Sequence, residues 1–568
     1  ISKSIYKPFI IKELVQQGYK PTRAIEEYNT WTPIANKALD LVMDDRPVIL
    51  NRAPTLHKHG VQAFKPIRFG GSSIRLNPLI VRGFNADFDG DTMSVQVPIS
   101  TVAVAEAHNM MPSQIPFKAG DKGLMAELSQ DYMLGLYYLT VPGKNTGKKF
   151  KTIAEAEKAK LGMQDVFTLG SKKVTLGKLA VNAVLPAGMR NMSRLMDNKE
   201  LNTILRTVIK DHPKDFANII SSFKDLGNQY AHERGTSLSI TDLNIDHSYR
   251  DKILKKYDAQ IKPGMTPIQV RDIYGKAKDE VIAEQHKLLK DNNRIYEMYH
   301  AGSMGGKGTA GMNQLLSMPG IMEDIKGNPI PYPIKKSWSE GLDTFDYWNS
   351  SYGARKGVID KSVNTEKSGA LNKELLMNIK NLLITEEDCG TTDGLELSST
   401  DKHTLDRYLA VDIRGIGKRN ELIDMELVQK AVSKEILVLK VRSPLTCEAD
   451  GGICIKCYGL MANGLPPRIG ENVGVIDAQA LTERSTQLTM QTFHSGGTAG
   501  AAGGILKGFP RLEELLKVPE KLMEKATLAE IDGVVQSILP NPVGGYDIFI
   551  NGIKHFINPG LTLTVKIG

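Results

Sequence analysis

The stretch that decides the fold of this chain is residues 85–91, which read Asn85-Ala86-Asp87-Phe88-Asp89-Gly90-Asp91. It places three carboxylates at alternate positions around a single glycine. In an extended backbone every second side chain points to the same side, so we expect the three aspartates to converge on one hard divalent cation. Mg²⁺ held by carboxylates keeps open positions for substrate phosphates. The run therefore predicts a catalytic Mg²⁺ site for phosphoryl or nucleotidyl transfer.

Two other interpretations of the same run compete with a catalytic metal site. An EF-hand calcium loop fails, because its sixth position is Thr92 instead of glycine and its twelfth is Pro98 instead of glutamate. A solvated acidic turn stays open from spacing alone, since Asp and Gly are common turn residues. The flanks at 73–76, 80–81 and 93–97 alternate or cluster like strands, which favours acids on a connection between buried strands.

The motif resembles the catalytic loop of the β′-type largest subunit of multisubunit DNA-dependent RNA polymerases. Residues 50–57 (LNRAPTLH) and 62–64 (QAF) are similar to further blocks of that family, in which they belong to a double-psi β-barrel. The resemblance implies that Asp87, Asp89 and Asp91 hold Mg²⁺, and that Arg52 and Asn85 contact the ribose hydroxyls. A DxDGD motif alone also suits two-barrel RNA-dependent RNA polymerases, which remain the alternative enzyme.

Residues 353–357 (GARKG) resemble the opening of the family's long bridge helix, which spans the cleft beside the active site. The chain has no proline between Pro333 and Pro444, and residues 342–383 are rich in helix formers. About 30 helical residues would reach roughly 45 Å, enough to cross a cleft that holds a nucleic-acid duplex. The alternative is an ordinary core helix. Residues 129–138 (SQDYMLGLYY) resemble another helix of the family.

Residues 487–497 (QLTMQTFHSGG) resemble the family's trigger loop. The resemblance implies that Gln487 lies near the ribose, Met490 against the base and His494 near the phosphates of the incoming nucleoside triphosphate. A histidine of ordinary pKa near 6.5 can donate a proton to departing pyrophosphate, although a positional role is equally consistent. Gln491 stands where the common bacterial pattern has arginine, and Ala370 where tyrosine is usual. These departures suggest a divergent polymerase, with a split subunit of a large bacteriophage as one precedent.

The four cysteines of the chain are Cys389, Cys447, Cys454 and Cys457. The last three follow the spacing C-x6-C-x2-C, which is typical of a structural zinc site closed by four thiolates. This matches the second zinc site of the resembled family. Two disulfides are the alternative, and the absence of a signal peptide argues against them.

Composition and patterning predict a large α+β multidomain protein. Lys and Arg number 72 against 64 Asp and Glu, a net charge of +8 that fits a nucleic-acid cleft within a balanced surface. No run of 18 apolar residues exists, so no membrane helix and no membrane partner are expected. Together with the resemblance, in which the glycine-rich connection 301–308 is similar to the family's F-loop, this implies five divisions: a barrel-containing catalytic region (1–120), a mainly helical region (121–300), F-loop and bridge helix (301–384), zinc site and trigger loop (385–507), and a helix with an incomplete strand-rich segment (508–568).

The resemblance covers nearly the whole chain, which opens at Ile1 inside the family's barrel region. It implies either a split subunit or a fragment, so the expected partners include a chain that supplies the amino-terminal β′ part. The others are a β-like subunit, an initiation factor, DNA template, nascent RNA and nucleoside triphosphates. The expected location is the cytoplasm of a bacterium or infected cell, or the virion of a virus. A catalytically silent scaffold is the non-enzyme alternative, which the intact aspartates and His494 disfavour.

Overall fold

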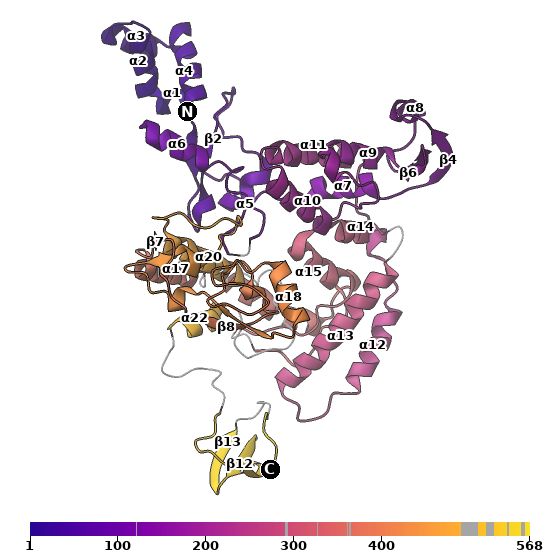
Figure 1. Ribbon diagram of the computed structural model, residues 1–568. Coiled ribbons are helices and arrows are strands. Elements are labelled where there is room, and N and C mark those ends of the chain that lie inside the picture. The colour runs from indigo at the N-terminus through magenta and orange to yellow at the C-terminus, as the bar shows by residue number, and fades with distance from the viewer. Residues whose placement is uncertain are drawn as a thin grey trace. The chain divides into compact units, whose positions relative to one another are not determined.

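The computed structural model describes residues 1–120, 122–289, 293–325, 328–359, 362, 365–489, 509–517, 527–541, 545–557 and 563–568 (Figure 1). The chain divides into two units, each assembled from three stretches. The first unit comprises Ile1–Leu128, Asn202–Ile220 and Asn372–Arg484. The second comprises Ser129–Leu201, Ser221–Leu371 and Ser485–Gly568. Helices and small sheets alternate in both, so the protein belongs to the mixed α and β class.

The amino-terminal stretch of the first unit begins with helices and continues into a small sheet. Its elements are α1 (Ser2–Ile5), α2 (Lys7–Gln16), α3 (Pro21–Thr30), α4 (Pro33–Asp45), β1 (Val48–Asn51), η1 (Lys58–Gly60), β2 (Val61–Phe64), η2 (Pro78–Ile80), α5 (Val81–Phe84), β3 (Ser94–Gln96) and α6 (Thr101–Asn109). Prolines at the first turn of α3 and α4 fix φ where no helical N–H is needed. The helices α2, α3 and α4 pack around Tyr6, Ile10 and Leu39.

Strands β1, β2 and β3 form an antiparallel sheet in the order β2-β1-β3. In β1 the residues alternate between buried and half-buried, as expected for a strand with one face on a core. The predicted strand at 93–97 is confirmed as β3. The predicted strands at 73–76 and 80–81 are wrong, because residues 73–76 form neither helix nor strand, Ile80 ends η2 and Val81 begins α5. Asn77 accepts a hydrogen bond from the Leu79 N–H and Pro78 opens the turn, and together they start a helical segment there.

The stretch from residue 129 to residue 316 is mainly helical, and all of it except Asn202–Ile220 belongs to the second unit. In chain order this part contains α7 (Gln130–Thr140), β4 (Asn145–Phe150), α8 (Ile153–Lys158), β5 (Val166–Leu169), β6 (Lys172–Val174), α9 (Leu176–Ala183), η3 (Ala187–Met189), α10 (Asn198–Asp211), α11 (Phe216–Arg234), η4 (Ile240–Leu243), α12 (Ser248–Asp258), α13 (Pro267–Leu288), α14 (Arg294–Ala301) and α15 (Gly305–Leu316). Helices α12 and α13 lie side by side around a shared core (Figure 1). A side chain at Gly135 of α7 would meet the Gly227 carbonyl of α11 at 1.8 Å, so these two helices approach through glycine.

The glycine-rich connection 301–308 is a short turn followed by the first residues of α15. Gly302 and Gly305 take positive φ values of 74° and 63°, so only these two glycines serve the reversal between α14 and α15. Gly308 lies inside α15 against Met304. The turn therefore requires glycine at two positions, and Gly308 belongs to the helix that follows.

The region expected to hold a long helix contains η5 (Trp338–Glu340), α16 (Thr344–Ile359) and α17 (Thr365–Ile379). Residues 353–357 lie within α16, as the resemblance implied. Residues 360, 361, 363 and 364 are outside the described part of the chain. The structure thus confirms helix on both sides of that interval, and one continuous bridge helix stays a prediction.

The remaining elements are small and closely spaced. They are β7 (Ile384–Glu386), β8 (Leu395–Ser398), η7 (Lys402–Thr404), α18 (Met425–Ser433), β9 (Val438–Val441), η8 (Pro444–Thr446), β10 (Ile453–Cys454), α19 (Ile455–Tyr458), α20 (Val473–Thr489), α22 (Phe509–Lys517), β11 (Val535–Pro540), β12 (Tyr546–Ile550) and β13 (Ile553–Ile557). Strands β7 and β10 pair in parallel, β8 and β9 pair antiparallel, and β11-β12-β13 form an antiparallel sheet. Among the described residues, each helix is too short or too polar to cross a membrane.

Candidate active site

The three aspartates follow directly on a helix end that turns the chain sharply. Helix α5 stops at Asn85, which takes a left-handed conformation (φ 47°, ψ 41°) that asparagine tolerates better than most residues. The backbone then bends through residues 88–90, and Gly90 has φ 124°. The expected convergence of the carboxylates is therefore achieved by a bend at a glycine, and the extended backbone from which it was predicted is wrong.

The register of the sheet brings Arg52 to the acids. Asn51, the last residue of β1, pairs with Ser94, the first residue of β3. Arg52, which follows β1, and the residues just before β3 therefore lie at the same end of the strand pair. The Arg52 Nε donates to Asp91 Oδ2 at 2.6 Å, and its Nη1 lies 3.4 Å from the Phe84 carbonyl. The guanidinium is thus fixed beside the acidic bend.

The carboxylate oxygens of Asp87, Asp89 and Asp91 lie within 4.8 Å of one another, and all three residues are exposed. Hydrogen bonding and repulsion from Asp87 raise the pKa of Asp89. The hydrogen bond from Arg52 is the main reason that the pKa of Asp91 is lowered. The backbone N–H of Asp87 also donates to Asp91 Oδ2 at 3.1 Å. Crowded oxygens of one charge, open to solvent, are the donor set that a hard divalent cation prefers.

The four predicted cysteines come together around the β7–β10 pair. Their sulfurs lie within 4.8 Å of one another, with Cys389 Sγ 3.7 Å from Cys457 Sγ and 3.8 Å from Cys447 Sγ. Four thiolates on a tetrahedral zinc at about 2.3 Å lie roughly 3.8 Å apart, so this spacing fits the ion. All four thiols are free. The alternative of two disulfides is therefore wrong.

Backbone donors support the thiolates. The Cys454 N–H points to Cys447 Sγ and the Cys457 N–H points to Cys454 Sγ, both at 3.3 Å. The pKa of Cys389 is lowered to about 7, because backbone N–H groups of Thr391 and Glu448 outweigh the effect of its burial. Burial instead raises the pKa values of Cys447 and Cys457, so Cys389 is the thiol that these environments favour in the anionic, metal-binding form.

Helix α20 leads toward the predicted trigger loop and is held within the first unit. A side chain at Gly474 would meet the Ile379 carbonyl of α17 at 2.0 Å, and Thr482 Oγ1 donates to Asn372 Oδ1 at 2.9 Å. The Tyr458 hydroxyl, next to the last cysteine, lies 3.1 Å from Asp477 Oδ1 on α20. Gln487 falls in the last turns of this helix, while Met490, Gln491 and His494 lie outside the described residues. Their contacts with substrate stay predictions.

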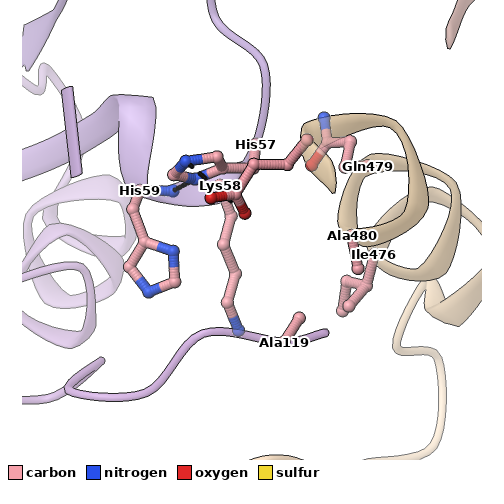
Figure 2. A pocket seen from close by; sticks show the side chains of 8 residues that line it. His57, Lys58, His59, Ala119, Ile476, Gln479 and Ala480 are labelled. Atoms are coloured by element: carbon pink, nitrogen blue, oxygen red, sulfur yellow. Dashed lines mark hydrogen bonds and ion pairs between the residues drawn. The ribbon is translucent and has the colours of Figure 1, made fainter. Parts of the chain in front are cut away.

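A small cavity separates α20 from the segment that follows Arg52. Figure 2 shows Ile476, Gln479 and Ala480 on the helix facing His57 and His59. Its volume is about 10 Å³, room for roughly one water molecule and not for a nucleotide. The cavity therefore marks a contact between two elements and not a substrate site.

An ion pair closes this contact. Glu483 Oε1 accepts from Lys118 Nζ at 2.5 Å, and the His57 Nε2 lies 3.9 Å from Glu483 Oε2. Burial lowers the pKa of His57, although Glu483 opposes that effect. Sequence reasoning did not find this pair, because its two members are 365 residues apart and neither belongs to a motif that marks a partner.

Comparison with known proteins assigns the two sites to one family. The family model described as RNA polymerase Rpb1, domain 2, matches residues 17–113, which include Arg52 and the three aspartates. The model described as RNA polymerase Rpb1, domain 5, matches residues 341–537, which include the four cysteines. The chain is therefore related to the largest subunits of multisubunit RNA polymerases.

Among such proteins its relatives are bacterial β′ subunits. It is 34% identical to the DNA-directed RNA polymerase subunit beta' of Caldicellulosiruptor saccharolyticus, over 94% of this chain and 51% of that protein. The subunits of Caldanaerobacter subterraneus subsp. tengcongensis and Tropheryma whipplei are also 34% identical over 94% of this chain, and 50% and 45% of their own lengths are covered. The chain is thus similar to bacterial β′ subunits over most of its own length, and it spans about half the length of the curated relatives it matches.

Proposed function

We propose that this chain carries the catalytic site of a DNA-dependent RNA polymerase and adds ribonucleotides to an RNA 3′ end on a DNA template. The observation that carries the proposal is the convergence of Asp87, Asp89 and Asp91 beside Arg52, inside a segment matched by a polymerase family model. The relatives are named DNA-directed RNA polymerase subunit beta', which supports DNA as the template and disfavours the two-barrel RNA-dependent alternative.

The three carboxylates would hold Mg²⁺. Bound there, the ion would lower the pKa of the RNA 3′ hydroxyl, and a second ion arriving with the triphosphate would stabilise the leaving pyrophosphate. Arg52, fixed by Asp91, would present its remaining N–H groups to the ribose hydroxyls, with Asn85 on the adjoining left-handed turn. Gln487, Met490 and His494 would close over the incoming nucleotide.

The cysteine cluster would hold zinc in a closed structural site. Its place is consistent with a supporting role, since Tyr458 beside it contacts Asp477 of α20, and α20 contacts α17 at Gly474. The zinc site would therefore fix the base of the trigger loop against the carboxyl-terminal part of the bridge helix.

The partners proposed with this activity are a DNA template, nascent RNA, nucleoside triphosphates, a β-like subunit, a chain with the amino-terminal β′ part, and an initiation factor. The proposed location is the cytoplasm of the bacterial or infected host cell whose DNA template is transcribed.

The test is Mg²⁺-dependent extension of an RNA primer by the chain together with its copurifying partners, on DNA and on RNA templates. Asp89→Ala should lose extension, and Asp44→Ala, at an exposed acid near the end of α4, should keep it. Extension on RNA alone would overturn the choice of template. A folded assembly that binds the primer but never extends it would favour the silent scaffold.

A further inference from the structure

Arg442 is the largest side chain in the described part of the molecule that is fully excluded from solvent. It follows β9, and its backbone N–H donates to the Tyr408 carbonyl at 2.8 Å. An arginine is almost never buried without partners, because its charge must be compensated where water cannot reach it. The identity of those partners therefore shows what the residue serves.

The guanidinium faces the cysteine cluster. Its Nη2 lies 3.2 Å from Cys389 Sγ, 3.3 Å from Cys457 Sγ and 3.6 Å from Cys454 Sγ. The Nε lies a further 3.4 Å from Cys457 Sγ. Cys447 has a backbone donor in the Cys454 N–H instead. Each of the four sulfurs is thus approached by a hydrogen-bond donor, and one arginine supplies three of them.

A second set of contacts holds the guanidinium in this orientation. Its Nη2 donates to Asp388 Oδ1 at 2.8 Å, and its Nη1 donates to Asn420 Oδ1 at 2.9 Å. Asn420 Nδ2 in turn donates to Asp388 Oδ2 at 2.6 Å. The three side chains form a closed network, so the planar fork has little freedom to leave the sulfurs.

The charges explain why a cation belongs there. Four thiolates around a divalent ion carry a net charge of −2, and Asp388 adds another negative charge beside them. A buried anionic cluster of this kind is costly unless cationic donors offset it. The guanidinium is the donor that this chain places against the sulfurs.

We propose that Arg442 is a positioning residue for the zinc centre: its hydrogen bonds to Cys389, Cys454 and Cys457 offset the charge of the metal-bound thiolates and thereby retain the ion. The proposal rests on the zinc site of the proposed function. Partners that hydrogen-bond metal ligands typically change metal affinity by about 10-fold to 100-fold when they are lost.

The test compares Arg442→Gln and Arg442→Lys with Arg419→Gln in the purified chain with its partners. Arg419 is a matched control, because it donates to the carbonyls of Gly390 and Thr391 beside Cys389 and has no sulfur contact among the described residues. Metal content is measured by atomic emission, and metal release by transfer to a chromophoric chelator. Co²⁺ in place of zinc reports the thiolates through its sulfur-to-metal charge-transfer band.

Arg442→Gln should release metal about 10-fold to 100-fold faster and move the Co²⁺ band to lower energy, since the sulfur lone pairs lose their donors. Arg442→Lys keeps the positive charge but has fewer donors, so its metal release and Co²⁺ band should lie between those of wild type and Arg442→Gln. It also serves as the test variant if Arg442→Gln does not fold. Unchanged release and an unchanged band in both variants would overturn the proposal, as would equal losses in Arg419→Gln. A wild-type chain that binds no zinc would overturn the zinc site itself.

Discussion

The carboxylate site and the cysteine site belong to the same unit of the molecule, but they differ in their access to solvent. The three aspartates are exposed, whereas Cys454 and Cys457 are buried and the other two cysteines are half-buried. Among the three aspartates, Asp91 receives a hydrogen bond from Arg52, whereas each of the four cysteine sulfurs is approached by a hydrogen-bond donor. An open oxygen site can exchange ligands and admit substrate, while a closed sulfur site can only hold its ion. The difference supports the proposal that the first site carries the reaction and the second supports the fold.

The largest expected effect that tests this difference between the two sites is the loss of primer extension when a carboxylate is removed. Asp87→Ala should lower primer extension by roughly a thousandfold or more, about 4 kcal/mol, because a ligand of the charge-stabilising ion is lost. Because Asp87 is exposed and lies in a bend, the melting temperature and zinc content should match wild type. Extension rates and metal analysis on the same preparation check this, and a variant that also loses zinc or unfolds would contradict the division of roles.

The opposite pattern is expected at the cysteines. Cys454→Ser should release zinc and destabilise the segment from β7 to the start of α20 by several kcal/mol, since structural zinc contributes directly to folding. Thermal unfolding and limited proteolysis measure the loss, with Ser433→Ala at an exposed position of α18 as the control. Full stability with zinc absent would show that the cluster is not structural.

The first two predictions also show what sequence alone can supply. Both residue clusters were predicted, because carboxylates two apart and a C-x6-C-x2-C run are local patterns whose chemistry needs few further facts. The route to the acidic cluster was not predicted, since Asn77 and Pro78 start a helical segment where apolar residues suggested a strand. Short apolar runs fit either structure, and a capping residue decides between them.

Contacts between distant segments were the part that sequence reasoning missed. Arg442 and the Lys118–Glu483 pair carry no motif, and each finds its partners only when strands and helices far apart in sequence meet. Arg442 directly follows β9, whose sequence Val-Leu-Lys-Val includes a charged and an exposed residue, so no local pattern marks either Arg442 or Lys118 as buried.

A moderate effect is expected at Arg52, which belongs to the open site. Arg52→Gln should lower kcat/KM for nucleotide addition by about 10-fold to 100-fold, or roughly 1.4 to 2.8 kcal/mol, as a charge-assisted hydrogen bond is lost. Stability should change by less than about 1 kcal/mol, because the Arg52–Asp91 pair is partly solvated. Steady-state kinetics beside thermal unfolding separate the two effects, and Arg68→Gln, which removes another partly exposed aspartate contact in the same unit, is the matched control.

The smallest expected effect is on the pH dependence of Mg²⁺ activation. Arg52 holds the pKa of Asp91 below its ordinary value, so this carboxylate stays charged as the pH falls, whereas the raised pKa of Asp89 makes that carboxylate the first to protonate. Arg52→Gln should therefore raise the pKa of Asp91, so that a second carboxylate protonates alongside Asp89 and the acidic loss of Mg²⁺ activation becomes steeper and has its midpoint at higher pH. Mg²⁺ titrations of extension at a series of acidic pH values measure it. A midpoint that stays in place would show that Asp91 does not depend on Arg52.

The pairing of Asn51 with Ser94 has a consequence for how such chains can vary in length. Between β2 and η2, residues 65–77 form no helix or strand, so insertions or deletions there leave the ladder untouched. One residue added at 92 or 93 would instead displace the acids from Arg52 and turn alternate side chains of β3 to the opposite face. Related chains should therefore differ freely in the number of residues before the catalytic bend and keep a constant number after it.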